Sequence, residues 1–278
     1  MPAPQSSVMQ ELAKAQFRTF MIKLPLDWRQ PQGEAGKQYL QAFKPSELVA
    51  IPPIGKLFIP ASVNKYHCDT VSEISGKFER FIDGICSAIC QAWSTWQTSA
   101  ALTGVTIFGP VATLGQLVGP PLLPIIMGAA PKSTPMELRY SMAIAMTLSN
   151  AWMQYTASVK VPALAWYPAF AAFPGPVAPP MPNVPSPVVA LAQVTVPVSK
   201  MVLKGQMCSN LGDPTALHHV ELFDSIADAF EKVFLIWQAS TQVTNVLGFG
   251  PIPTFAPPVV PMGPVVGGSG NMLPGGLV

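Results

Sequence analysis

The sequence predicts a mainly α fold with long extended proline-rich segments, built from three related helix-plus-arm repeats. The stretch 78–110 recurs without a gap as 219–251, so that Trp96-Gln97 matches Trp237-Gln238, and both copies end in Phe-Gly-Pro. A fainter copy lies between them, around Ala151-Trp152. Each copy places apolar residues at helical spacing and then continues into a stretch interrupted by proline. This order, helix first and extended segment second, defines the repeat.

Three start signals support the helices of the repeats. Capping-box patterns occur at 70–73 and 134–137, where a threonine is followed three residues later by glutamate. The third helix is expected to open at Asp213-Pro214, a capping residue followed by proline at the first helical position. We therefore divide the chain into units at 70–131, 132–200 and 201–278, the last carrying a Pro/Gly-rich tail.

Residues 1–69 form a separate N-terminal part. Apolar residues at roughly helical spacing predict a short amphipathic helix over 6–22. Prolines then interrupt every candidate element over 23–61, leaving room for a short strand at 56–59 and one helical turn near 38–43. This part is expected to be an irregular segment that leads into the first repeat.

The distribution of charge is the unusual property of the chain. Charged residues make up 11% of the sequence, where about 25% is usual for a globular chain. The segments 84–131, 161–199 and 233–278, called here the three charge-free segments, contain no charged residue at all. Their prolines restrict them to extended, polyproline-like or turn conformations. Because such apolar chain is poorly solvated, we expect it to lie on neighbouring subunits.

Several functional classes find little support in the residues. The net charge of +2, without a basic cluster, disfavours a nucleic-acid surface. No catalytic motif occurs, and the glycine-rich run at 265–270 does not join a strand to a helix, so we expect no enzyme and no cofactor. Cys86 and Cys90 lie one helical turn apart, but the paired spacings of a zinc site are missing, so no metal is expected. All four cysteines are expected to be reduced.

A membrane-inserted or membrane-associated component of a secretion or pore complex is the main alternative. The stretch 84–109 has neither charge nor proline and is long enough to cross a bilayer as a helix. Polar residues are clustered in its middle, however, and disfavour insertion. The N-terminus also lacks the basic and apolar regions of a secretory signal, so synthesis in the cytoplasm without a signal peptide is expected.

The sequence therefore predicts a non-catalytic structural subunit of a large multi-chain particle, such as a virion, a phage or a phage-tail-like assembly. Its partners are expected to be other protein subunits of the assembly, including copies of itself, with membrane contact less favoured and no nucleic acid. The expected contact residues are aromatic residues of the helices and residues of the proline-rich segments: Trp96, Phe108, Pro110, Trp152, Tyr155, Trp237, Phe249, Pro251 and Phe255.

Overall fold

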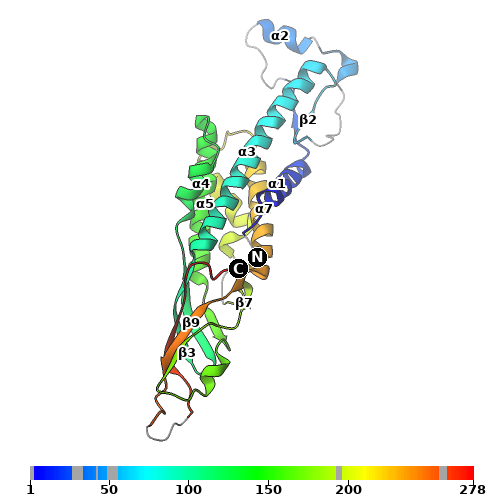
Figure 1. Cartoon of the computed structure of the whole chain (residues 1–278). Helices are drawn as coiled ribbons and strands as arrows, with labels where there is room; N and C mark the ends of the chain where they lie inside the picture. The colour runs from blue at the N-terminus through cyan, green and yellow to red at the C-terminus, as the bar shows by residue number, and fades with distance from the viewer. Residues whose placement is uncertain (1–2, 27–33, 42, 49–55, 192–195, 257–261) are drawn as a thin grey trace.

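The computed structural model shows an elongated molecule with helices at one end and a β-sheet at the other (Figure 1). It describes residues 3–26, 34–41, 43–48, 56–191, 196–256 and 262–278. The fold combines α-helices with a six-stranded antiparallel sheet, so the expected mainly α fold of helix-plus-arm repeats with long extended proline-rich segments is wrong. The extended segments predicted from the prolines pair with one another as strands.

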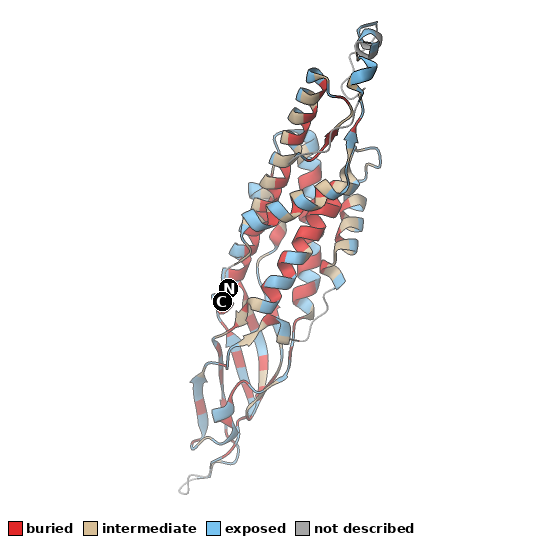
Figure 2. Ribbon diagram, turned by 90° about the vertical axis from the view of Figure 1, so that its right-hand side faces the viewer, coloured by how far each residue is buried: buried red, intermediate tan, exposed pale blue. Residues whose placement is uncertain are grey.

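The helical end is built from seven α-helices of the described chain. They are α1 (Ser6–Thr19), α2 (Glu34–Gln41), α3 (Lys65–Ser99), α4 (Leu122–Ala129), α5 (Pro135–Ser158), α6 (Lys200–Leu211) and α7 (His219–Ser240). Helix α1 packs between α3 and α7, while α4 packs on α3 and α5, and α6 joins α5 to α7. The buried residues run along the facing sides of these helices (Figure 2).

The sheet collects strands from all three charge-free segments. Its strands are β3 (Ala101–Phe108), β4 (Val111–Val118), β5 (Val161–Leu164), β6 (Val177–Met181), β9 (Val246–Pro251) and β10 (Val266–Met272), in the order β5-β4-β3-β10-β9-β6. All neighbouring pairs are antiparallel, so β3, β5 and β9 point in one direction. Each of these three strands closely follows a long helix, α3, α5 or α7. The sequence repeat therefore corresponds to a long helix followed by a strand. In all three copies the strand runs away from the helical end in the same direction.

Two pairs of short strands and four 3-10 turns complete the described chain. Strand β1 (Lys23–Leu24) pairs in parallel with β2 (Ile59–Pro60), and β7 (Ser186–Pro187) pairs with β8 (Gln242–Val243). The 3-10 turns are η1 (Pro45–Glu47), η2 (Pro168–Ala171), η3 (Val188–Ala190) and η4 (Val196–Val198). The N-terminal part holds α1 within the range expected for a helix, α2 where one helical turn near 38–43 was expected, and β2 at the end of the strand expected at 56–59.

The predicted helix starts have different outcomes. The capping box at α5 is confirmed: the Glu137 amide donates to Thr134 Oγ1, and the Thr134 amide donates to Glu137 Oε2, both at 3.1 Å. The start predicted at Thr70 is wrong, because α3 begins at Lys65 with Asn64 as its cap. Thr70 lies inside α3 and donates to the Tyr66 carbonyl one turn earlier. The helix is longer than predicted because nothing between Asn64 and Thr70 interrupts it.

The start predicted at Asp213-Pro214 is also wrong. Asp213 accepts a hydrogen bond from the Thr215 amide and so holds a local turn, whereas α7 begins at His219. Helices α4 and α6 were not expected. Helix α4 lies within a charge-free segment and contains Pro124. Pro124 is tolerated there because the first-turn amides of a helix have no intrahelical partner.

Aromatic side chains from α3, α5 and α7 form the centre of the helical end. Trp152 lies 4.8 Å from Trp93 and from Trp96, measured between ring centroids, and 5.5 Å from Trp237. All four rings are buried and meet mainly edge to face, the arrangement that aromatic quadrupoles prefer. The two copies of the repeat bind each other here, because Trp237 Nε1 donates to Gln97 Oε1 at 2.9 Å. The repeated Trp-Gln pair therefore joins α3 to α7.

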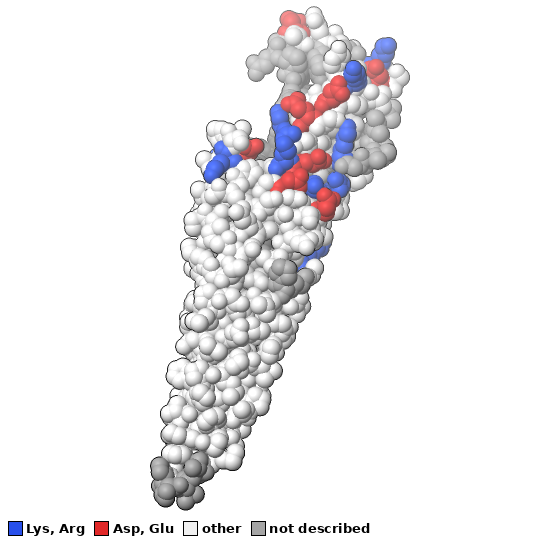
Figure 3. All heavy atoms as spheres, in the orientation of Figure 1, with Lys and Arg blue, Asp and Glu red and all other residues white. Residues whose placement is uncertain are grey.

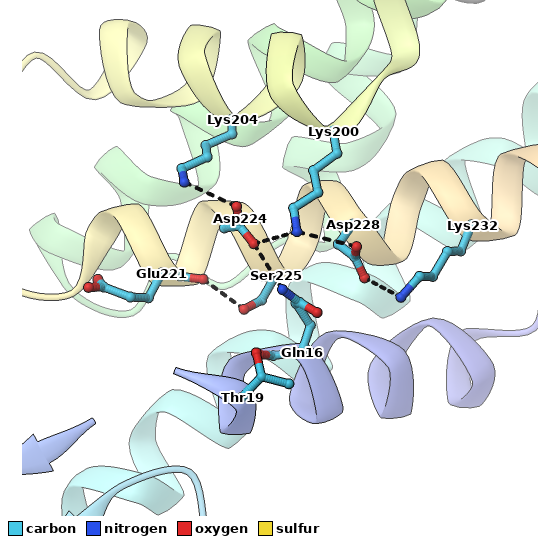
Figure 4. Close-up of polar contacts among 9 residues, drawn as sticks. All are labelled: Gln16, Thr19, Lys200, Lys204, Glu221, Asp224, Ser225, Asp228 and Lys232. Carbon is cyan, nitrogen blue, oxygen red and sulfur yellow. Dashed lines mark hydrogen bonds and ion pairs between the residues drawn. The ribbon is translucent and has the colours of Figure 1, made fainter. Parts of the chain in front are cut away.

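Polar contacts of Asp224 link α1 and α6 to α7 (Figure 4). Asp224 of α7 is almost fully buried and contacts Lys200 Nζ at 2.8 Å and Lys204 Nζ at 3.1 Å, both from α6. It also accepts a hydrogen bond from Gln16 of α1 at 3.1 Å. Burial opposes the charged form of Asp224, but the hydrogen bonds from Lys200, Lys204 and Gln16 outweigh it and lower the pKa of the carboxyl.

Replacing Asp224 by asparagine is expected to lower the free energy of unfolding by about 2 kcal/mol, because two lysines lose their shared partner. The lowered pKa means that this stabilisation is complete above the carboxyl's unfolded pKa, near 4, and is lost as pH falls through the folded pKa. Urea denaturation at neutral and acidic pH measures both effects. The exposed pair of Glu73 and Lys77 is the control, since Glu73→Gln should change stability by less than about 0.5 kcal/mol. Equal losses in the two variants would contradict this role.

Candidate interface on the charge-free sheet

Every strand of the sheet lies in a charge-free segment, so none of the six strands carries a charged side chain, and the exposed Lys160 directly precedes β5. Lys, Arg, Asp and Glu gather over the helical end in Figure 3, and the surface over the sheet is uniformly uncharged in the same view. Exposed surface of a globular chain normally contains many charged groups, because they are best solvated there. A charge-free half of an elongated molecule is therefore the strongest candidate for a surface that contacts something other than water.

The inner face of the sheet is closed within the chain. Tyr167 lies across it and donates its hydroxyl to the Val246 carbonyl at 2.6 Å. Glycine at position 248 makes room for the ring, since a Cβ there would stand 2.6 Å from Tyr167 Cζ. Phe170 stacks on Tyr167 with ring centroids 5.2 Å apart, and its carbonyl accepts from the Val265 amide. The second charge-free segment thus covers strands formed by the first and third.

Asn183 fixes the same segment to the start of β9. Its Oδ1 accepts from the Val246 amide at 2.9 Å, and its Nδ2 donates to the Val243 carbonyl at 3.1 Å. Both bonds are buried, so they satisfy backbone groups that water cannot reach. The three charge-free segments therefore shelter one another on this face, and their expected contact with neighbouring subunits stays a prediction.

The outer face of the sheet is neutral and partly apolar. Side chains alternate along β9, where Val246, Gly248 and Gly250 are buried and the intervening residues are exposed. Across the strands, Phe249 is paired with Ser269, Ser269 with Thr106, and Thr106 with Thr113, so one row holds a phenyl ring and three hydroxyls. We define the outer face by its exposed or half-buried residues: Thr106, Phe108, Val111, Thr113, Val177, Leu247, Phe249, Pro251, Val266 and Ser269.

Prolines occupy both edge strands of the sheet. Strand β6 contains Pro179 and Pro180, and β5 contains Pro162. Within the described residues, the outer edges of β5 and β6 pair with no further strand. Proline has no amide hydrogen and cannot donate to an added strand, which is a common protection against edge-to-edge pairing. These edges are therefore poor sites for the addition of a strand from another chain.

The expected contact residues fall into three groups according to how far they are buried. Trp96, Trp152, Tyr155 and Trp237 are buried in the helical end and pack against one another, so they are not available to a neighbouring subunit. Phe108 and Phe249 are 52% and 43% exposed on the outer face, and Pro251 is also exposed. Pro110 and Phe255 are half-buried near the same end of the sheet.

Of the outer face, sequence reasoning missed the three hydroxyl residues and also Val111, Val177, Leu247 and Val266. The alternation along 246–251 is the signal that could have revealed this surface, because period two assigns Leu247, Phe249 and Pro251 to one face.

The thiols and histidines lie apart from the outer face and serve packing. All four cysteines are free, and burial raises the pKa of Cys90 to about 12. His67 is buried at the start of α3, where its Nε2 accepts from the Ala61 amide at 2.9 Å. Among the described residues, no group of three or more His, Cys, Asp or Glu side chains is placed to hold a metal ion.

Helix α3 ends at Ser99, so the stretch 84–109 is divided between a helix and strand β3. No helix in the described part of the chain combines the length and apolar character that crossing a bilayer requires. The chain matches no protein-family model, no curated protein and no solved structure.

Proposed function

We propose that the protein is a non-catalytic structural subunit of a large multi-chain particle and that the outer face of its sheet contacts other subunits of that particle. The main supporting observation is that none of the six strands carries a charged side chain, while Phe108 and Phe249 are exposed on one face of the sheet. Stable protein interfaces are depleted of charge at their centre and enriched in aromatic residues. A virion, a phage or a phage-tail-like assembly fits a subunit of this shape, and the neighbours include copies of the same chain.

The composition of the outer face favours protein over lipid as its partner. The central row of Ser269, Thr106 and Thr113 places three hydroxyls in the middle of the face, between the apolar side chains. A protein neighbour can pair these hydroxyls with its own polar groups, whereas hydrocarbon cannot, so their burial in lipid costs free energy. The membrane-associated component expected as the alternative is therefore the weaker proposal.

Two added carboxylates should prevent association through this face. In the variant Phe108→Glu/Phe249→Glu, association is expected to weaken at least about 100-fold, because each carboxylate must leave water without a basic partner. Mass photometry of the purified chain, alone and mixed with the other components of its particle, measures the change. Because the contact contains no ion pair, association of the parent chain should persist at high salt.

The matched control carries the same two charges on the helical end. Met153 and Met201 are 63% and 84% exposed, so Met153→Glu/Met201→Glu changes net charge equally without touching the sheet. Association of this control should equal that of the parent chain. A parent chain that stays monomeric with every particle component, or sheet variants that assemble normally, would refute the proposal. Binding of the parent chain to neutral lipid vesicles in place of protein would favour the membrane alternative.

A further inference from the structure

A cavity lies on the helical end of the molecule, and no strand of the sheet contributes to its lining. It lies between α3, the first turns of α5 and the connection from α6 to α7, and its volume is about 470 Å³. Most of its lining is apolar and comes from Phe78, Phe81, Met136, Tyr140, Leu217 and Leu222. Pockets for small molecules commonly measure about 300–1,000 Å³ and are lined by such side chains with a few polar groups. The size and lining therefore suit a small ligand.

Tyr140 supplies a polar group that the protein itself does not use. Its side chain is 9% exposed and packs edge to face on Phe81 with ring centroids 6.0 Å apart. No described residue forms a hydrogen bond with its hydroxyl, which is not fully buried and lines the cavity. Burial, followed by the nearby Asp213 carboxylate, raises the pKa of Tyr140 to about 12, so the hydroxyl keeps its proton and can donate it.

The charged side chains around the cavity are already engaged within the chain. Lys77 forms an ion pair with Glu73 at 2.7 Å. Glu137 accepts the Thr134 amide in the capping box, and Asp213 accepts from Thr215. A strongly charged ligand would have to displace one of these contacts. A neutral ligand would need only the apolar lining and the Tyr140 hydroxyl.

We propose that this cavity binds a neutral, largely apolar small molecule with a ring or short acyl chain and one carbonyl or hydroxyl oxygen. The ring or chain packs on Phe78 and Phe81, and the oxygen accepts a hydrogen bond from Tyr140. The site is independent of the outer face of the sheet, so a subunit of the particle could carry such a molecule whether or not it is assembled.

The neutral fluorescent ketone prodan is a suitable probe, because it joins a naphthalene ring to one carbonyl and its emission reports both polarity and hydrogen bonding. We expect saturable binding to the full chain with one site and emission shifted to the blue of that in water. Tyr140→Phe should weaken binding about three- to tenfold, the value of one hydrogen bond. Leu217→Trp should abolish binding by filling the mouth, where Leu217 is 61% exposed.

Met201→Trp is the matched control, since it adds the same ring at an exposed position of α6 outside the cavity. Its prodan affinity should equal that of the parent chain, and thermal melts should confirm that every variant is folded. Absence of saturable binding, or equal affinity in Leu217→Trp and the parent chain, would overturn the site. Full affinity in Tyr140→Phe would overturn the assigned hydrogen bond and with it the ligand class.

Discussion

Trp152→Ala is expected to lower the free energy of unfolding by about 3–5 kcal/mol, the range for removing a large aromatic ring from a core. Trp152 is 2% exposed and contacts Trp93, Trp96 and Trp237, so its removal leaves a cavity at the point where α3, α5 and α7 meet. The backbone cannot collapse easily into this space because long helices surround it. Urea denaturation followed by circular dichroism measures the loss.

Two variants separate this effect from a general disturbance of α5. Trp152→Phe keeps an aromatic ring and should lose less stability than Trp152→Ala. Met153→Ala changes the adjacent residue, which is 63% exposed, and should lie within about 0.5 kcal/mol of the parent chain. Similar stability of Trp152→Ala and Met153→Ala would show that the tryptophans do not form the core of the helical end.

Ser269→Pro is expected to disrupt the sheet, with a loss of about 3 kcal/mol or more. Ser269 lies in β10, which is hydrogen-bonded to β3 on one side and to β9 on the other. Whichever way its amide points, the amide faces a paired strand, and proline removes that donor. Hydrogen exchange should show faster exchange in β3 and β9 together, because β10 is the strand that joins the two halves of the sheet.

Ser269→Thr is the conservative control, since threonine keeps the hydroxyl and suits an exposed strand position. Its exchange rates should match those of the parent chain. The edge strand β6 already contains two prolines, which illustrates that the cost depends on position in the sheet. Unchanged exchange of β3 and β9 in Ser269→Pro would exclude β10 from the centre of the sheet.

The local features that the sequence predicts correctly are those set by neighbouring residues. The capping box at Thr134 depends on Glu137 three residues later, and the apolar stripe of α3 is visible in the spacing of its residues. The repeat was also visible in the sequence. In the structure its first and third copies contact each other, because Trp237 donates a hydrogen bond to Gln97. Two local start signals were wrong: Asn64 caps α3 ahead of Thr70, and Asp213 holds a local turn while α7 begins at His219.

The pairing of the charge-free segments could not be predicted because it depends on distant residues. Strand β10 contains three glycines, so its sequence has little of the alternation that indicates a strand. Tyr167, about a hundred residues earlier in the chain, lies over Gly270 of β10 and over Gly248 of the neighbouring β9, where a Cβ would stand 3.1 Å and 2.6 Å from its side chain. The expectation that these segments need shelter was sound physically, but they find much of it in one another. Part of the apolar surface stays exposed, and Phe108 and Phe249 on the outer face belong to it.

The proposed interface is tested most directly by hydroxyl-radical footprinting of the chain in its native particle and as a free subunit. Phe108 and Phe249 are exposed in the structure, and both should be oxidised readily in the free chain. Tyr66, exposed at the charged end, serves as the internal reference. If the outer face is the interface, Phe108 and Phe249 become protected from oxidation in the particle, while the oxidation of Tyr66 changes little. Equal oxidation of both phenylalanines in the particle and in the free chain would contradict it.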